Sequence, residues 1–321
     1  MLKLGDFMLV AFKPHGSRKI YSGVIVEDLI LDINNAYFQL LISFGYSEME
    51  AKIKAGREAP RNPKKLIKRG LKIIDVVNLV RENIESLISI EDAAYPISEV
   101  KLTAPVQNPT KIICVGLNYL DHIRETGKTP PSEPVIFAKA PSSIIGPYDP
   151  IVLPKISTQV DYEAELAVVI GTKCKNVSEK DALKYVLGYM AANDVTARDL
   201  EFKTPIRFFW SKSLDTFCPI GPGIALQEDV ENPNNLRITC KVNGNVVQDS
   251  NTRNMIFSVS KIISYISSGI TLLPGDIILT GTPGGIGFAR KPQYFLKPGD
   301  VVEVSIERIG TIKNPVIAKR R

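Results

Sequence analysis

Three acidic residues near the middle of the chain have the types and spacing of a metal site. Glu163 and Glu165 lie in the segment VDYEAELAVVIG, and on a strand residues i and i+2 leave the same face, where their charges repel. Asp194 follows the apolar segment LGYMAAN, where an unpaired carboxylate is costly. Three carboxylates with water form the oxygen ligand set that Mg²⁺ prefers, with Mn²⁺ or Ca²⁺ as alternatives. A site without metal also fits, with the glutamates on a solvated strand face and Asp194 capping a helix through Thr196.

A histidine and a glutamate in GLNYLDHIRETGK have the spacing of a general base. Glu125 follows His122 by three residues, so the two side chains lie side by side on a helix. The pKa of histidine lies near neutral pH and a carboxylate stabilises the imidazolium, so such a pair can deprotonate water. A local helix-end contact is the alternative for His122. The only other histidine, His15, lies in a turn rich in lysine and glycine and is predicted to be exposed.

Two basic residues are candidates for contact with an anionic substrate. Lys212 lies in the aromatic segment FFWSKSLDTF, and a partly buried lysine there can stabilise an enolate; a surface lysine is the alternative. Arg198 follows Asp194 by about one helical turn and can bind a substrate carboxylate. A structural ion pair of Arg198 with Asp199 or Glu201 is the alternative.

A glycine-rich loop, TGTPGGIG, follows the strand pattern DIILTG at residues 280–287. Glycine lets backbone N–H groups approach an anion closely, so the loop is interpreted as a small-anion site, with a plain turn as the alternative. The loop matches neither GxxxxGK[ST] nor a GxGxxG that opens a helix, so nucleotide binding is not indicated.

Hydrophobic patterns define the elements that must position these residues. In the first third they predict a small sheet over residues 7–32 and helices over residues 34–44, 47–54 and 75–88. Residues 96–105 are extended and flanked by proline, so we interpret them as a linker between domains 1–104 and 105–321.

The second part of the chain reads as strands joined by long loops. Strands are predicted over residues 111–115, 166–170, 187–193, 277–281 and 301–306, a hairpin over 236–248 around Asn243-Gly244, and a helix over 255–267. Strands outnumber helices and do not alternate regularly with them. This order favours a mixed α+β fold or rolled β-sandwich over a doubly wound parallel sheet.

Composition narrows the class of protein. The formal charge is +6, from 40 basic and 34 acidic residues, and suits an anionic substrate. The lysine-rich residues 52–72 are interpreted as a solvated surface, because no nucleic-acid-binding motif accompanies them. No run of about 18 apolar residues indicates a membrane span, and Lys3 and Asp6 interrupt any signal-peptide pattern, so we expect a cytoplasmic protein. The four cysteines form no CxxC pair and are predicted to be reduced.

Six motifs occur in one order: GLNYLDH, FAKAPSS, DYEAEL, NDVTARDL, SKSLDTFCPIGP and LLPGDIILTGTPGGIG. In this order they resemble the fumarylacetoacetate hydrolase superfamily over roughly residues 105–318. The similarity is greatest to its acylpyruvase, oxaloacetate decarboxylase and hydroxyheptadienedioate isomerase group. Residues 1–104 resemble, more weakly, the small α/β N-terminal domain of many members.

The resemblance implies a mixed β-sandwich roll, a homodimer, and Mg²⁺ or Mn²⁺ as cofactor. The residues that match the family's sites are Glu163, Glu165 and Asp194 as metal ligands, His122 and Glu125 as the water-activating pair, Lys212 as the enolate-stabilising lysine, and Arg198, Gly281 and Thr282 near the substrate. One position departs from the pattern: Leu117 stands where some acylpyruvases have arginine before the Asn-Tyr pair.

The expected function is therefore metal-dependent enolate chemistry on a small 2-oxo acid. C–C bond hydrolysis, decarboxylation and keto–enol isomerisation share this chemistry, because the metal stabilises the enolate in each. A 2-keto-3-deoxy sugar acid dehydratase or a 2-oxopent-4-enoate-type hydratase is the alternative within the superfamily. A non-catalytic anion-binding protein is the alternative outside it.

Overall fold

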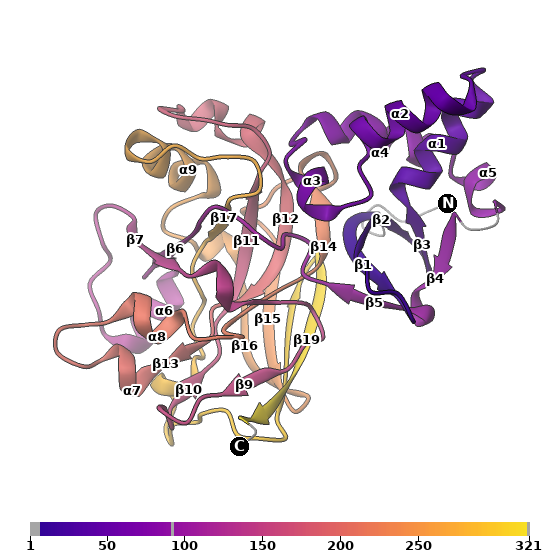
Figure 1. Ribbon diagram of the computed structural model, residues 1–321. Helices are drawn as coiled ribbons and strands as arrows, with labels where there is room; N and C mark the ends of the chain where they lie inside the picture. Colours follow the sequence, from indigo (N-terminus) through magenta and orange to yellow (C-terminus); the bar gives the residue numbers. More distant parts are fainter. Residues whose placement is uncertain (1–6, 91–92, 320–321) are drawn as a thin grey trace.

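The computed structural model describes residues 7–90 and 93–319, and Figure 1 shows an N-terminal part beside a larger strand-rich part. Residues 1–6, within the segment inspected for a signal peptide, lie outside the described residues. The N-terminal strands are β1 (Met8–Pro14), β2 (Tyr21–Val26), β3 (Leu29–Asp32), β4 (Ala94–Pro96) and β5 (Val100–Thr103). The helices there are α1 (Ile33–Ser43), α2 (Glu48–Glu58), α3 (Pro63–Ile67), α4 (Lys72–Glu82) and α5 (Ile84–Ile88).

The predicted N-terminal sheet and first two helices are confirmed. Asp32 caps α1 by accepting hydrogen bonds from two backbone N–H groups, and Ser47 with Glu50 forms a capping box on α2. The single helix predicted over 75–88 is wrong: α4 ends at Glu82 and α5 begins at Ile84. The amide of Asn83 donates to the carbonyl of Leu79, which a continuous helix would use for the backbone N–H of Asn83.

The second part of the chain forms two packed sheets. The large sheet adds β6 (Ile112–Gly116), β7 (Val135–Lys139), β8 (Ile144–Ile145), β11 (Ala164–Ile170), β12 (Val186–Asn193), β14 (Cys218–Leu226) and β17 (Ile277–Leu279). The second sheet has the order β16 (Asn245–Asn251), β15 (Arg237–Val242), β18 (Val301–Ile306), β19 (Gly310–Ala318) and β9 (Ile151–Leu153). A short pair joins β10 (Val160–Asp161) to β13 (Thr196–Ala197).

The remaining helices are short apart from one. They are α6 (Leu120–Thr126), α7 (Arg198–Glu201), α8 (Phe208–Lys212) and α9 (Val259–Gly269). The 3₁₀ segments are η1 (Ile97–Glu99), η2 (Pro141–Ser143), η3 (Glu179–Tyr185), η4 (Gln227–Asp229), η5 (Thr252–Asn254) and η6 (Gly287–Ala289). Asn243 and Gly244 both have positive φ in the predicted hairpin turn, as a type I′ turn requires.

Sheet order confirms the α+β class and excludes a doubly wound fold. The large sheet runs β4-β3-β2-β1-β14-β12-β11-β17-β6-β7, and its pairs are antiparallel except β17 with β6 and β8 with β14. Residues 96–105, interpreted as a linker, contain β5, which pairs with β1. Strand β1 also pairs with β14, so hydrogen bonds join the two parts of the chain. The domain boundary at residue 104 stays a prediction.

The two faces of β11 explain why its sequence is almost continuously apolar. Leu166, Val168 and Ile170 face the core between the two sheets, whereas Ala167 and Val169 face a second core shared with the N-terminal helices. Side chains alternate along a strand, so Glu163 and Glu165 share the side of Ala167 and Val169. The fold therefore directs both glutamates away from the second sheet.

Other sequence predictions concern the surface and the core, and those on the cysteines, His15 and the lysine-rich segment are confirmed. No helix in the described ranges is long and apolar enough to cross a bilayer. The four cysteines are buried and free, and His15 is exposed. Most of the lysines in residues 52–72 are exposed, namely Lys52, Lys64, Lys65, Lys68 and Lys72.

The packing of the large sheet predicts a specific loss of stability. Ile278 is fully buried in β17 between β11 and β6, so Ile278→Ala should lower the free energy of unfolding by about 2–5 kcal/mol through lost burial and a residual cavity. Ile53→Ala on the exposed side of α2, where the side chain is 63% exposed, should change it by less than about 0.5 kcal/mol. Urea denaturation followed by circular dichroism measures both, and equal losses would contradict this packing.

Candidate active site

Strand register brings the three predicted metal ligands together. Glu165 pairs with Ala192 across β11 and β12, and the backbone N–H of Asp194 donates to the carbonyl of Glu163 at 2.9 Å. Asp194 is two residues beyond Ala192, so it leaves the same face as the glutamates. A slip of one residue would turn it to the opposite face.

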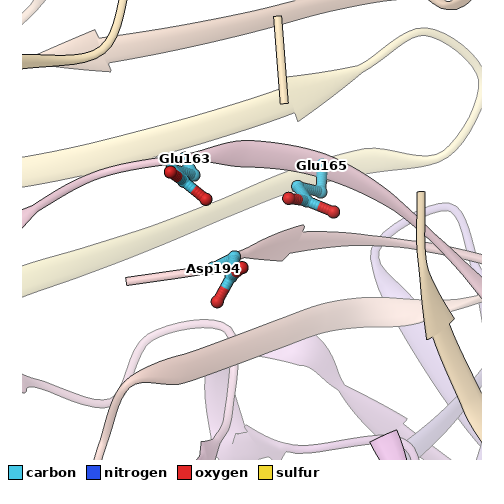
Figure 2. A group of neighbouring side chains, drawn as sticks. All are labelled: Glu163, Glu165 and Asp194. Carbon is cyan, nitrogen blue, oxygen red and sulfur yellow. The ribbon is translucent and has the colours of Figure 1, made fainter. Parts of the chain in front are cut away.

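The three carboxylates converge on one buried point. Figure 2 shows Glu163 and Glu165 on one strand and Asp194 at the end of its neighbour. One oxygen from each lies within 4.8 Å of the others, and the exposed fractions are 5%, 2% and 0%. A solvated strand face is therefore wrong for these glutamates. Asp194 does not cap a helix either, since Thr196 begins β13 and its hydroxyl donates to the backbone carbonyl of Asp194.

Two lysines are buried against the carboxylates. The ammonium of Lys212 donates to Glu163 and Asp194, each at 2.8 Å, and to the hydroxyl of Thr196 at 2.7 Å. Lys139, at the end of β7, donates to the other oxygen of Asp194 at 2.6 Å. Lys212 is 3% exposed, so the alternative of a surface lysine is wrong.

Arg198 binds three acids at once. Its guanidinium donates to Asp161 at 2.9 Å, to Glu201 at 2.9 Å and to Glu163 at 2.5 Å. The structural pair predicted with Glu201 is therefore present. Asp199 instead accepts from Ser157 and from the N–H of Thr158. Arg198 also lines the pocket, and its role in substrate binding stays a prediction.

The pKa values of the two glutamates are shifted in opposite directions. Burial raises the pKa of Glu163, but the opposing charges of Lys212 and Arg198 are stronger and hold that pKa well below its usual range. Burial raises the pKa of Glu165 well above its usual range, and the charges of Asp194 and Glu163 raise it further. Burial lowers the pKa of Lys212, but Asp194 and Glu163 outweigh burial and raise it. Lys212 is therefore charged at neutral pH. Glu165, by contrast, has no cationic side chain as an ion-pair partner among the described residues.

The charge balance of this cluster fits a divalent cation. The buried acids are Asp161, Glu163, Glu165, Asp194 and Glu201, and the buried cations are Lys139, Arg198 and Lys212. Counted as ionised, the five carboxylates outnumber the three cations by two, and all of them except Glu165 form an ion pair among the described residues. Within that part of the chain Glu165 makes no ion pair and accepts one hydrogen bond, from the N–H of Gly281 at 2.7 Å. An all-oxygen donor set with this deficit fits Mg²⁺ or Mn²⁺.

The histidine–glutamate pair lies at the same pocket. Nδ1 of His122 is 2.9 Å from Glu125 on α6, as the i, i+3 spacing predicts. His122, Glu125, Glu163 and Glu165 all line a pocket of about 300 Å³. Because Glu125 occupies Nδ1, Nε2 is the ring nitrogen available for proton transfer.

Apolar side chains form the outer walls of this pocket. Phe137 stacks on Phe208 with ring centroids 5.4 Å apart, and Phe202 lies 4.8 Å from Phe288. The lining also includes Val115, Leu117, Val135, Ile286 and Ala289. The ammonium of Lys212 lies 5.2 Å from the centre of the Phe137 ring. Aromatic and charged side chains therefore line one pocket together.

The glycine-rich loop binds anions, but they are the protein's own carboxylates. The N–H of Gly281 donates to Glu165 and that of Gly285 donates to Glu125, both at 2.7 Å. The N–H groups of Gly287 and Phe288 donate to Asp161. The N–H groups of the loop therefore bind carboxylates, as its glycine content predicts, and binding of a substrate anion by this loop stays a prediction.

The other two residues predicted near the substrate differ in position. Thr282 lines the pocket, and its hydroxyl accepts from the amide of Gln248 at 2.9 Å. Gly281 has φ +101°, and a Cβ there would lie 2.8 Å from that of Asn118, so only glycine fits. The N–H of Gly281 donates to Glu165, so a contact of Gly281 with substrate stays a prediction.

Sequence reasoning missed two members of the cluster. Lys139 ends the apolar segment VIFAK, and a lysine at the end of an apolar strand is the signal that could have found it. Asp161 opens the segment DYEAEL and carries no signal by itself, because it binds Arg198 from a separate segment of the chain. Glu201 was predicted only as the structural partner of Arg198, three residues away.

A pocket that ends on buried carboxylates, with a histidine–glutamate pair at its side, is the arrangement of an enzyme site. The sequence profile described as the fumarylacetoacetate (FAA) hydrolase C-terminal family matches residues 111–317. The oxaloacetate tautomerase of Xenopus laevis mitochondria is 50% identical over 68% of this chain and 69% of its own length. The corresponding rat protein is 49% identical over 69% and 71%.

Solved structures agree over nearly the whole chain. A fumarylacetoacetate hydrolase from Exiguobacterium antarcticum has a TM-score of 0.77 at 35% identity, covering 98% of this chain and 100% of its own. A 2-hydroxyhepta-2,4-diene-1,7-dioate isomerase from Mycobacterium marinum has a TM-score of 0.71 at 31% identity, with the same coverage. The chain belongs to the fumarylacetoacetate hydrolase superfamily and is an enzyme of that superfamily.

The raised pKa of Glu165 predicts opposite effects of one substitution with and without metal. Glu165→Gln should raise the melting temperature of metal-free protein at pH 7, because burial and the neighbouring carboxylates raise the pKa of this carboxyl in the fold, which lowers stability at a pH above its unfolded pKa. The same variant should lose most of the stabilisation by Mg²⁺, which for wild type is about 2.7 kcal/mol at 100 times the dissociation constant. Thermal unfolding in EDTA and in a Mg²⁺ series measures both effects. Undiminished stabilisation by Mg²⁺ in the variant would contradict the ligand assignment.

Proposed function

We propose that this enzyme uses a divalent metal ion to interconvert the enol and keto forms of a small 2-oxo acid, with oxaloacetate as the first candidate. The observation that carries the proposal is the two-charge deficit of the buried carboxylate cluster beside His122. The names of the relatives support tautomerisation of oxaloacetate in particular. Decarboxylation of the same substrate requires the same enolate and is the nearest alternative.

Each residue of the cluster then has a distinct role. Glu163, Glu165 and Asp194 hold the ion. A bound Mg²⁺ would act as a Lewis acid that polarises the 2-oxo group and lowers the free energy of the enolate. Lys212 orients Glu163 and Asp194 and places a positive charge at the base of the pocket, where it favours developing negative charge on the substrate. Arg198 and Thr282 line the pocket and bind the substrate carboxylate.

In this proposal His122 transfers the proton. Nε2 of His122 removes a proton from the carbon beside the 2-oxo group, and in the reverse direction it returns that proton. Glu125 accepts from Nδ1–H, which fixes the tautomer and stabilises the imidazolium that forms. The enolate oxygen takes its proton from solvent, which completes the enol.

A longer 2-oxo acid is the second candidate substrate. The pocket of about 300 Å³ continues past the carboxylates along an apolar wall that oxaloacetate would not fill. Isomerisation of a hydroxyheptadienedioate, or hydrolysis of an acylpyruvate by water that His122 deprotonates, would use that wall. Dehydration of a 2-keto-3-deoxy sugar acid, hydration of a 2-oxopent-4-enoate and non-catalytic anion binding are the remaining alternatives. A panel of these acids separates them.

Two expectations about the protein's setting stay predictions. The homodimer rests on the resemblance alone. The cytoplasmic location rests on the sequence of the first residues, whereas the relatives with about half of their residues identical are named as mitochondrial proteins.

Metal dependence is tested by chelation and one ligand variant. EDTA should abolish turnover of oxaloacetate enol, and Mg²⁺ or Mn²⁺ should restore it. Glu163→Gln should lower both kcat/KM and bound metal by at least about tenfold, because it removes a ligand and the partner of Lys212. Asp249→Asn, an exposed carboxylate on β16, is the matched control and should have no effect. Full activity with full metal content in Glu163→Gln would exclude the proposal.

The role of His122 is tested by alanine variants of the two histidines, with His15 as the control. His122→Ala should lower kcat for tautomerisation by about 10²–10⁴-fold through loss of general acid–base catalysis, with metal content unchanged. His15→Ala, which alters the exposed histidine, should match wild type. Tautomerisation is measured by the loss of the ultraviolet absorbance of the enol, and decarboxylation is measured by the release of CO₂. Wild-type tautomerisation in His122→Ala would remove the histidine from the mechanism.

A further inference from the structure

Both oxygens of the Glu125 carboxylate are held. One lies 2.9 Å from Nδ1 of His122, and the other accepts the N–H of Gly285 at 2.7 Å. A carboxylate fixed at both oxygens cannot rotate without breaking a hydrogen bond. The geometry of the histidine–glutamate pair therefore depends on where the glycine-rich loop places the N–H of Gly285.

The Gly285 segment is clamped from two sides. It has φ +104°, and a Cβ there would lie 2.1 Å from the carbonyl oxygen of Val247, so only glycine fits against β16. The carbonyl of Gly285 accepts from the hydroxyl of Tyr162 at 3.2 Å and from Nε of Arg290 at 3.3 Å. Arg290 also donates through Nη2 to the carbonyl of Val247 at 2.7 Å. Arg290 thus ties the loop to the strand against which it packs.

Tyr162 connects this loop to the carboxylate cluster. It lies between Asp161 and Glu163 and is fully buried. Asp161 accepts the N–H groups of Gly287 and Phe288, and it also accepts from Arg198. The tripeptide 161–163 therefore contacts the loop through Asp161 and Tyr162 and supplies two carboxylates of the cluster, Asp161 and Glu163.

We propose that Tyr162 and Arg290 are positioning residues, which fix the Gly285 peptide so that Glu125 holds His122 in the Nδ1–H tautomer with Nε2 directed to substrate. Neither side chain lines the pocket. These hydrogen bonds form a relay from Tyr162, next to Glu163, through the Gly285 peptide and Glu125 to His122. The inference rests on the proposed function of His122 and Glu125, and its test is designed to be read independently of activity.

The direct test uses the tautomer of His122. The chain has two histidines, so ¹⁵N spectra of the imidazole rings contain His122 and the exposed His15 as an internal reference. At a fixed pH, Tyr162→Phe should shift the two nitrogen signals of His122 towards those of a mixture of tautomers, and the signals of His15 should not move. Tyr294→Phe, which removes a hydroxyl that donates to Asp300 instead, is the matched control. Unchanged His122 signals in Tyr162→Phe would overturn the proposal.

Kinetics provide the second readout. Tyr162→Phe and Arg290→Met should each lower kcat for enol turnover by about three- to tenfold, the loss expected for one hydrogen bond, with KM and metal affinity unchanged. In combination with Glu125→Gln, Tyr162→Phe should cause no further loss, because both act through the same contact. A multiplicative loss in the double variant would overturn the relay. Wild-type turnover in His122→Ala alongside an altered tautomer in Tyr162→Phe would instead reject the proposed function and retain the relay.

Discussion

The burial of five carboxylates with three cations is the constraint on which the rest of this site depends. Each ion alone would be too costly to remove from water, and the cluster persists because almost every charge meets an opposite one at hydrogen-bonding distance. The exception is Glu165, whose buried carboxylate makes no ion pair in the described part of the chain and has a raised pKa. An imbalance of this kind is stable when a cation completes it. In the proposed function the same electrostatics support the chemistry, since a divalent cation bound by these acids would also supply the Lewis acid for enolate formation.

The sheet supplies the rigidity that such a cluster needs. Strands β11 and β12 are covered on both faces, by the second sheet on one side and by the N-terminal helices on the other. Their register is consequently fixed, because a slip would exchange two well-packed sets of apolar side chains. That register places Asp194 beside Glu163 across neighbouring strands. Carboxylates at the ends of paired strands keep their separation better than carboxylates on loops would.

The base and the walls of the pocket differ in chemistry. The base is charged: Glu163, Glu165 and Asp194 lie at two paired strands, Lys212 ends α8, and the N–H of Gly281 donates to Glu165. The walls are apolar side chains from short helices and connections, including Phe202, Phe208 and Phe288. We expect changes in the walls to alter which substrate tail fits without altering the charged base. Leu117, the position at which the sequence departs from the arginine expected in some acylpyruvases, lies in this wall.

The sequence by itself determined the fold class, most element positions and the identity of the three convergent carboxylates, because these depend on period-two alternation, local turn chemistry and ordered motifs. It also determined that His122 and Glu125 adjoin, since helical spacing is local. Only the tertiary structure decided which charges are buried together. Lys139 and Asp161 are distant in sequence from the residues that they bind. The structure also showed that the glycine-rich loop serves the protein's own acids, because hydrogen-bond partners between segments are set by packing, which no local pattern records.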